Sequence, residues 1–331
     1  MSKESVDMIS NGFPKTKGLK KRFSIGLTLR FMSEEEYKSI IDEFNEYIYE
    51  IYFSPPFGDK FHSRKEVAKG LKPSPETEEK VFRILTYAVD KGIQLTLALN
   101  TKVILLENVL KAAERVLERV NIGSFTTLMN FAGPLKCLYP DIPIKCSYNE
   151  GVKNPSELEQ ICSHNLFSSI VLGNSTLRNN DLFRQAVTKG LEVELLLNNG
   201  CTFACNNFCF PSSHCEEDFM KSLESHPINF LYSRQSIIPR EFFTYYIENK
   251  NIRHFKISNR PCTYNYLSTC LKSYIQNIDF ELIKRDIKYY RLWARLVHFN
   301  RFLGFLDFDK ICEYKDNLWE HHNSHNLKAI R

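Results

Sequence analysis

The stretch Gly190-Leu191-Glu192-Val193-Glu194-Leu195-Leu196-Leu197-Asn198-Asn199-Gly200-Cys201 contains the unit that repeats along this chain. A glycine stands where a helix would end, an apolar run of strand length follows, and polar residues come after the run. Eight such runs alternate with segments of helical character. They are Phe23 to Leu29, Glu50 to Ser54, Ile93 to Asn100, Phe125 to Met129, Ile144 to Tyr148, Ser169 to Leu172, Glu192 to Asn198 and His254 to Ile257.

The segments between these runs carry the signals of helix ends. Ser33 and Glu36 form a capping box, Asn154 and Pro155 suit the cap and the first position of a helix, and Gly92 and Gly190 suit helix ends. Strand and helix in regular alternation require parallel pairing with helical crossovers. Eight units of this kind predict a single (β/α)8 barrel of the TIM type, and an open doubly wound sheet is the alternative.

The bulk composition sets limits on the class of protein. With 331 residues, 43% of them hydrophobic, the chain can bury the core of one large α/β domain. The net charge of +5 permits an RNA or acidic-peptide partner without requiring one. Neither an apolar run of transmembrane length nor a secretory signal is visible, so we expect a cytoplasmic protein with no membrane span.

Three regions are expected along the chain. Residues 1–22 form a flexible basic lead-in, residues 23–278 form the barrel with a cysteine cluster after its seventh strand, and residues 279–331 form a C-terminal helical extension. The stretch from Phe280 to Phe299 interleaves aromatic and basic side chains, which could stack on and neutralise RNA. Aromatic residues at helical spacing also pack on domain surfaces, so both interpretations stay open.

Polar residues gather where the predicted strands end. In a parallel barrel the carboxyl ends of all strands surround one mouth, where active sites lie, so these residues are candidates to hold a substrate. Polar residues also end strands for purely structural reasons, and only their collective placement indicates function. The set comprises Asn100, Asn130, Asn149, Asn174, Asn198, Asn199 and Arg260.

The segment after the seventh run is rich in cysteine. Four of the ten cysteines, Cys201, Cys205, Cys209 and Cys215, fall there, and Cys262 follows the eighth run. In a reducing compartment such crowding favours metal binding over disulfides. Thiolates are soft ligands, and we expect a [4Fe-4S] cluster held by four of these five cysteines.

Other interpretations of the cysteine segment remain open. A structural zinc site usually brings its cysteines in close CxxC pairs, whereas here three, three and five residues intervene. Buried free cysteines are possible, although four so close together are hard to explain by packing. The motif of radical S-adenosylmethionine enzymes has three and then two intervening residues and normally follows the first strand, so the present spacing departs from it.

Several segments resemble one known family. The run from Glu194 to Cys201 with further cysteines behind it is similar to the signature of the collagenase-like peptidases, peptidase family U thirty-two. Three more segments are similar to that family's elements in the same order: Glu50 to Gly58, Ile144 to Asn149, and Phe255 to Arg260. Ser258 and Asn259 stand where the family's last element has Glu and Gly.

The resemblance implies a barrel with an oxygen-sensitive [4Fe-4S] cluster. By position it implies Cys201 as the first cluster ligand, Cys205 or Cys209 as the second, Cys215 as the third and Cys262 as the fourth. Relatives take part in oxygen-independent hydroxylation of ubiquinone precursors or of RNA bases, and others are linked to proteolysis. A partner subunit of the same family is also implied as a possibility.

Charged residues near the predicted mouth are the candidate catalytic groups. Lys256 and Arg260 could fix an anionic substrate or offset the charge of a thiolate-bound cluster. An internal ion pair with Glu194, the third candidate, is the structural alternative. His214 could ligate or donate a proton, but the sequence favours a solvent-facing loop histidine.

Three function classes follow from the sequence. The first is an iron-sulfur enzyme, or a subunit of one, that hydroxylates or otherwise modifies an RNA, a peptide or a small aromatic substrate. The second is a peptidase, although HExxH and GxSxG motifs are not found in the sequence. The third is a non-catalytic RNA- or peptide-binding module with a structural metal site such as zinc.

Overall fold

The predicted barrel is present in the computed structural model of the protein. The structure describes residues 20–29, 32–57, 74–101, 104–173, 180–202, 235–237, 247, 252–257 and 263–276. Eight parallel strands close on themselves in the order β1-β10-β7-β6-β5-β4-β3-β2. Their bounds are β1 Phe23–Gly26, β2 Ile48–Phe53, β3 Gln94–Leu99, β4 Ser124–Thr127, β5 Ile144–Cys146, β6 Ser169–Leu172, β7 Glu192–Leu196 and β10 His254–Lys256.

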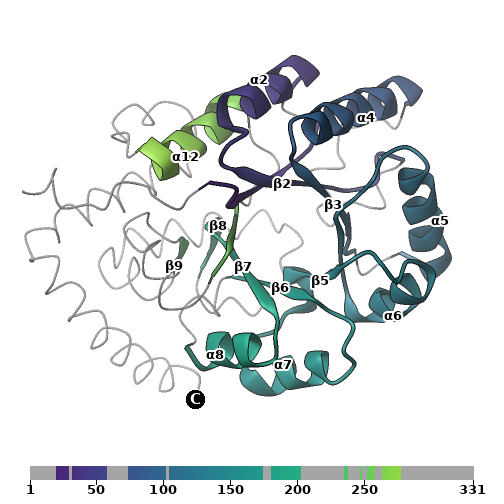
Figure 1. Ribbon diagram of the computed structural model, residues 1–331, viewed down its shortest axis with the longest axis vertical. Coiled ribbons are helices and arrows are strands. Elements are labelled where there is room, and N and C mark those ends of the chain that lie inside the picture. Colours follow the sequence, from purple (N-terminus) through teal and green to yellow (C-terminus); the bar gives the residue numbers. More distant parts are fainter. Residues whose placement is uncertain are drawn as a thin grey trace, which may run out of the picture.

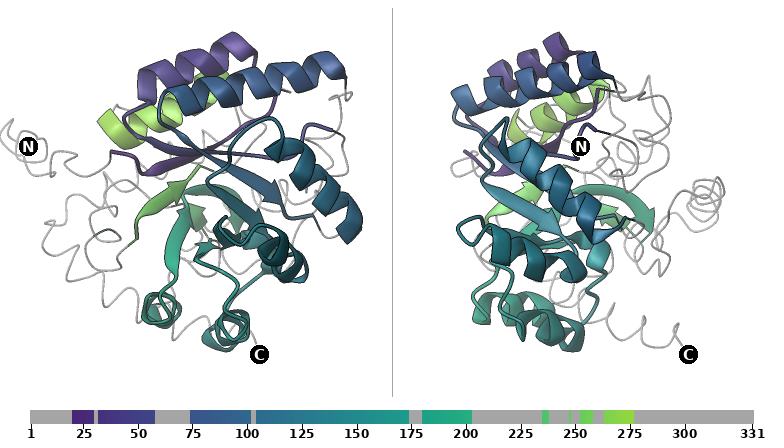
Figure 2. Two further views of the ribbon diagram at one scale, coloured as in Figure 1. Left: turned by 45° about the vertical axis from the view of Figure 1, so that its right-hand side comes forward. Right: turned by 90° about the vertical axis from the view of Figure 1, so that its right-hand side faces the viewer.

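Helices follow the strands and surround the barrel (Figure 1). They are α2 Glu34–Phe44, α4 Pro75–Asp90, α5 Leu106–Leu117, α6 Met129–Leu138, α7 Pro155–Cys162, α8 Asn180–Thr188 and α12 Tyr264–Gln276. Figure 2 shows from two further sides that these helices lie outside the strands. α12 lies beside α2, where Lys272 and Glu43 form an ion pair at 2.8 Å, so the last described helix closes the ring next to the first.

The expected helix signals are confirmed. The Ser33 side chain accepts a hydrogen bond from the Glu36 amide, and the Glu36 carboxylate accepts one from the Ser33 amide. At the start of α7, the Asn154 side chain accepts a hydrogen bond from the Glu157 amide. Gly92 and Gly190 have φ of +71° and +77°, which an L side chain rarely adopts. Local chemistry therefore sets where several of the crossover helices begin and end.

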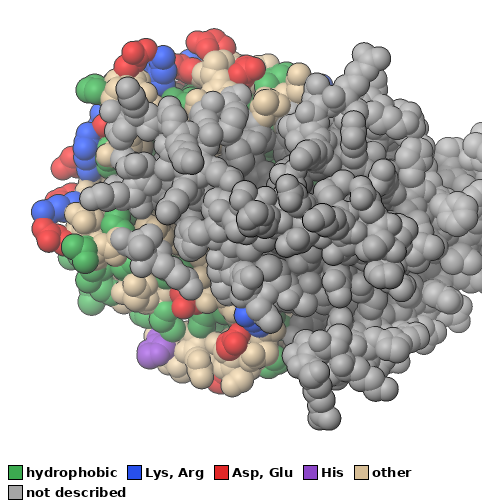
Figure 3. Space-filling view, turned by 180° about the vertical axis from the view of Figure 1, so that it is seen from behind, with side chains coloured by type: hydrophobic (Ala, Val, Ile, Leu, Met, Phe, Trp, Pro, Cys, Tyr) green, Lys and Arg blue, Asp and Glu red, His purple; other side chains and the backbone are tan. Residues whose placement is uncertain are grey.

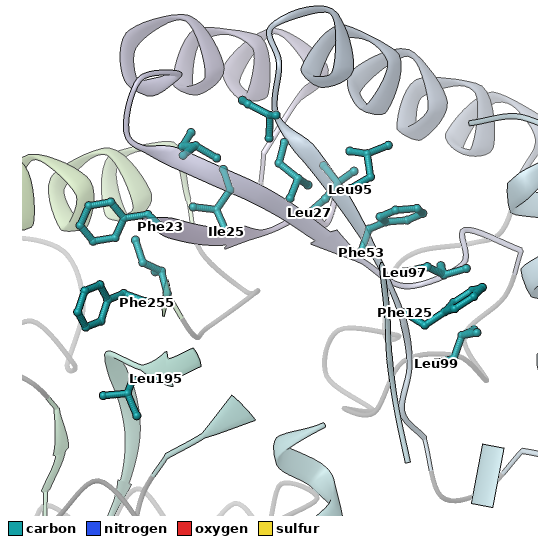
Figure 4. Packing of buried hydrophobic residues seen from close by; sticks show 14 of the residues in the cluster. Phe23, Ile25, Leu27, Phe53, Leu95, Leu97, Leu99, Phe125, Leu195 and Phe255 are labelled. Carbon is teal, nitrogen blue, oxygen red and sulfur yellow. The ribbon is translucent and has the colours of Figure 1, made fainter. Parts of the chain in front are cut away.

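The core lies between the strands and the helices. One side of each strand carries large apolar residues, and Figure 4 shows ten of the buried residues by name, among them Phe53, Leu95 and Leu97. The Phe23 ring lies 6.4 Å from the Phe255 ring and 6.0 Å from the Tyr274 ring of α12, measured between centroids. The first and last strands of the barrel are therefore joined by aromatic packing as well as by backbone hydrogen bonds.

Most strands end one to three residues before the predicted ends, and three of these differences have a visible cause. β1 ends at Gly26 rather than Leu29, because the Tyr37 hydroxyl, not a neighbouring strand, binds the amide and the carbonyl of Thr28. Met129 and Asn130 form the first turn of α6, so Asn130 does not follow a strand end and is exposed. Tyr148 begins a short 3-10 helix, Tyr148–Glu150, instead of ending β5.

A second correction concerns the segment after β7. The sequence predicted a loop there, but Asn198–Thr202 forms a strand, β8, that pairs antiparallel with β9, Gln235–Ile237. An antiparallel partner distant in the sequence supplies the backbone hydrogen bonds that a loop would have left to solvent. The backbone of Cys201 is therefore part of strand β8 and not of a loop.

The predicted outer regions fall largely outside the described residues. Residues 1–19 and the C-terminal extension, 279–331, are not described. At the barrel's edge Arg22 donates hydrogen bonds to the carbonyls of Ile252 and Arg253 at 3.3 and 3.0 Å. No described helix is both long enough and apolar enough to cross a membrane.

The Tyr37 hydroxyl gives a test of the fold. We expect Tyr37→Phe to lower the free energy of unfolding by about 1–3 kcal/mol, because the buried amide of Thr28 loses its hydrogen-bond acceptor. Tyr87→Phe is the matched control, since the Tyr87 hydroxyl bonds Asp42 at the surface, and it should change stability by less than about 0.5 kcal/mol. Urea denaturation followed by circular dichroism measures both, and equal effects would contradict this account of the β1–α2 connection.

Candidate functional site

The interior of the barrel is charged. Side chains alternate along each strand, so the residues between the outward apolar positions point into the lumen. TIM barrels usually fill this space with branched apolar residues. Here Glu50, Lys145, Glu194 and Lys256, which we call the charged cluster, occupy it, and they are 0%, 7%, 2% and 9% exposed.

Lys145 connects opposite walls of the barrel. Its ammonium group on β5 donates to Oε2 of Glu50 on β2, which lies three strands away in the ring. Thr96 donates to the same carboxylate oxygen at 2.6 Å and is itself within 2.8 Å of the Ser124 hydroxyl. Hydrogen bonds thus run from β5 through β2 to β3 and β4, which fixes the Glu50 carboxylate from two sides.

Glu194 on β7 lies between two lysines. Its Oε2 is 3.9 Å from Nζ of Lys145 and 3.9 Å from Nζ of Lys256 on the adjacent strand β10. The Lys256 ammonium also lies 3.7 Å from the centroid of the Tyr52 ring, a cation–π contact, and the Tyr52 hydroxyl donates to the Ile257 carbonyl at 2.7 Å.

The pKa values of Glu194 and Lys145 keep these two groups ionised. Burial alone would raise the pKa of the Glu194 carboxyl, but the charges of Lys256 and Lys145 outweigh it and hold this pKa at about 2. Burial would likewise lower the pKa of Lys145, yet Glu194 and Glu50 raise it above its ordinary value. The cluster contains two acidic and two basic side chains, so its formal charges balance, as buried charges must.

Two rings lie on the amino-terminal side of this cluster. Tyr49 and His254 stack with centroids 3.8 Å apart and planes 17° apart. Burial raises the pKa of the Tyr49 hydroxyl and lowers the pKa of the His254 imidazole, so both rings are neutral near pH 7. The Lys145 ammonium lies 5.5 Å from the centroid of the Tyr49 ring, so the stack adjoins the charged cluster.

A neutral polar network lies at the carboxyl ends of β3 and β5. The Asn100 amide donates to the Ser147 hydroxyl at 2.9 Å, and Asn149 donates to the Asn100 carbonyl at 3.1 Å. Two of the asparagines singled out in the sequence are thus brought together at the mouth. Asn198 and Asn199 belong to β8, Asn130 lies on α6, and Asn174 lies outside the described residues.

The predicted catalytic residues are placed in part. Lys256 and Glu194 are brought together, and the internal ion pair considered from the sequence is present at 3.9 Å. Arg260 and His214 lie outside the described residues. The sequence analysis named Glu50 and Lys145 only as parts of segments that resemble the family, and it missed their position in the lumen. The signal that could have found both is a charged residue at an inward position of an otherwise apolar strand.

The predicted cluster ligands are mostly untested. Cys205, Cys209, Cys215 and Cys262 lie outside the described residues, and only the backbone of Cys201 is described. Within the described ranges, no group of three or more His, Cys, Asp or Glu side chains is arranged to hold a metal ion. The described cysteines include Cys146, whose burial in the core raises the pKa of its thiol well above the ordinary value.

The part of the surface that the structure describes gives no separate indication of a ligand. On the described part of the face in Figure 3, basic and acidic side chains lie next to one another along one edge. Such neighbours form ion pairs elsewhere on the described surface, for example Arg119 with Glu79 at 2.9 Å and Lys189 with Glu159 at 2.6 Å. The lumen and its mouth are therefore the candidate site.

Removing Lys145 tests whether it balances both glutamates. We expect Lys145→Met to destabilise the protein by about 3–5 kcal/mol, because two buried carboxylates lose their shared cation. The double variant with Glu50→Gln should recover part of this loss, since it removes one of the two uncompensated charges. Lys136→Met, at a surface position of α6, is the control and should behave like wild type in urea denaturation. A Lys145→Met variant as stable as wild type would contradict this role.

The pH dependence of stability tests Glu194. Its pKa in the folded protein, about 2, lies below its ordinary value of 4.5, so its ion pairs stabilise the fold above about pH 4.5 and are lost as the pH falls towards 2. The stability difference between wild type and Glu194→Gln should therefore shrink as the pH is lowered through that window. Glu107→Gln, at an exposed ion pair, should show no comparable trend; a difference for Glu194 that is constant with pH would count against the ion pairs.

Comparisons with known proteins find distant similarity only. No family model matches the chain, and no curated protein matches it. Among solved structures, the U32 peptidase Mk0906 is similar at 11% identity over 76% of this chain and 97% of that chain, with a TM-score of 0.43. A putative dehydratase from Mesorhizobium loti is similar at 15% identity over 66% and 55%, with a TM-score of 0.37. Deoxyribose phosphate aldolase from Aeropyrum pernix is similar at 14% over 54% and 76%, with a TM-score of 0.39. Similarity at this level says nothing about the reaction or the ligand.

Proposed function

We propose that this chain is a [4Fe-4S] enzyme, or a subunit of one, that modifies a substrate at the carboxyl mouth of its barrel. Oxygen-independent hydroxylation of an RNA, peptide or small aromatic substrate is the reaction we favour. The observation that carries the proposal is the position of the cysteine-rich segment. It leaves the barrel at the carboxyl end of β7, the strand that contributes Glu194 to the charged lumen.

The barrel topology supports this placement. β7 and β10 are neighbours, with Glu194 opposite His254 and Leu196 opposite Lys256. The segment that begins with Cys201 follows β7, and Cys262 follows β10 in the sequence. Segments that leave two adjacent parallel strands start at the same end of the barrel, as a cluster held by cysteines from both segments would require.

The donor set suits an iron-sulfur cluster. Cys201 and three of Cys205, Cys209, Cys215 and Cys262 would hold it through thiolates. When bound, such a cluster supplies one-electron chemistry. Glu194 and Lys256 would hold or orient a polar substrate group beneath the mouth, and Arg260 is a further candidate for this role. If these cysteines were only buried packing residues, the charged side chains in the lumen would have no part in their role.

Iron content tests the proposal directly. Protein purified without oxygen should contain roughly four iron and four sulfide per chain, with a broad absorption band that bleaches on reduction. Cys201→Ser should lose most of the iron, because one thiolate ligand is removed. Cys137→Ser, at an exposed cysteine of α6, is the matched control and should keep the wild-type content.

Two outcomes would refute the proposal. One is wild-type protein that contains zinc and no iron, which would favour a structural metal site. The other is a Cys201→Ser variant with the full iron content and an unchanged spectrum. Cleavage of a peptide library by the same preparation, lost in Glu194→Gln and kept in Cys201→Ser, would instead favour a peptidase.

A further inference from the structure

His254 is a titratable residue in the barrel that the proposed function does not use. It is the first residue of β10, two positions before Lys256, and its ring stacks on the Tyr49 ring with 3.8 Å between centroids. Tyr49 is the residue that the pairing of β1 with β2 skips, next to Glu50. This bulge brings the Tyr49 ring past β1 to the ring on β10.

The stack suits only the neutral form of the imidazole. Nδ1 of His254 is buried and has no hydrogen-bond partner in the described part of the chain. A neutral imidazole can leave one nitrogen without a proton, whereas an imidazolium carries an N–H group at both nitrogens. Protonation with the ring in place would therefore bury a charged donor that has no acceptor, which costs more than burying a neutral one.

Charged and titratable groups lie near His254 on each strand packed against it and on its own strand. They are Glu192 and Glu194 on β7, Tyr49 and Glu50 on β2, Lys145 on β5, Arg22 next to β1, and Arg253 and Lys256 on β10 itself. Burial has the largest influence and lowers the pKa of His254, Lys145 lowers it further, and the three carboxylates raise it.

The neighbouring charges are already engaged with one another. The Glu50 and Glu194 carboxylates contact Lys145, and Glu194 also contacts Lys256. The Lys145 ammonium lies 5.5 Å from the centroid of the Tyr49 ring, so an imidazolium stacked on that ring would be a second cation beside it. A proton on His254 would add one positive charge to a cluster whose formal charges balance.

We propose that the stack of Tyr49 and His254 is a pH-sensitive switch: in mild acid the imidazole takes up a proton from water, leaves the Tyr49 ring to reach solvent, and loosens β10. Because β10 also carries Lys256, the switch couples the pH to the charged cluster. It involves described residues alone and does not rest on the proposed iron-sulfur function.

The direction of the pH effect follows from the two states of the chain. In the folded protein the pKa of His254 lies below its ordinary value of 6.5, so the unfolded chain takes up this proton first as the pH falls. The contribution of His254 to stability is therefore present above about pH 6.5 and lost as the pH falls through the folded pKa. This window lies above the one in which Glu194 titrates, so the two effects can be separated.

Urea denaturation of the full-length protein at about pH 7.5 and about pH 5.5 tests the switch. We expect the folding equilibrium constant of the wild type to fall about three- to tenfold more between these pH values than that of His254→Phe, which keeps a ring for the stack but cannot be protonated. His164→Phe makes the same change at an exposed position and should keep the wild-type pH dependence.

Hydrogen exchange locates the change in the barrel. In acid, the amides of β10, His254–Lys256, should exchange faster in the wild type than in His254→Phe at the same pH. The amides of β4, Ser124–Thr127, lie across the ring and should not differ between the two proteins. If His254→Phe does not fold, His254→Gln takes its place, and NMR titration of the wild-type imidazole gives a test that needs no variant.

The switch is overturned if the non-titrating variant loses as much stability as the wild type over this pH range. An imidazole of His254 that titrates at or above 6.5 in the folded protein would overturn it as well. So would a wild-type β10 that keeps its protection in acid, because the stability would then be lost elsewhere in the chain.

Discussion

The pairing of Lys145 with Glu50 and Glu194 is the interaction on which the rest of the barrel depends. A lone ion in this lumen would cost several kcal/mol, and only partners on β2 and β7, reached across the closed ring, offset that cost. The pair cannot form in an open sheet with the same strand order, because opposite walls would not face one another. Charge pairing and barrel closure therefore support each other.

This constraint also explains how much of the fold can be predicted from sequence. The eight strands and the helix caps of α2 and α7 follow from local signals, since caps, apolar runs and glycines act over a few residues. Strand ends are harder to predict. β1 stops early because Tyr37, eleven residues from Gly26, takes over the hydrogen bonds, and β8 forms because β9 pairs with it from a distant part of the chain.

The candidate site was harder to predict than the fold. Glu194 and Lys256 were recognised as charged residues near the predicted mouth, and their contact was foreseen as an alternative. Glu50 and Lys145 are 95 residues apart, and no local pattern reveals that they meet. In hindsight a glutamate within Ile48–Phe53 and a lysine within Ile144–Cys146 are costly residues in buried strands, and charges in such places require partners.

Neutral and charged polar groups occupy different places in the barrel. The Asn100–Ser147 network belongs to β3 and β5, whereas β7 and β10, which precede the cysteine segments, lie on the other side of the ring. A substrate that enters the mouth would meet the neutral Asn100–Ser147 network at the ends of β3 and β5, and then the charged cluster, whose members come from β2, β5, β7 and β10. Because the charged cluster is balanced, it would orient polar groups without attracting ions from solution. A redox centre beside β7 and β10 would then face a substrate held by hydrogen bonds, and this arrangement suits a modifying enzyme better than a binding module that relies on net charge.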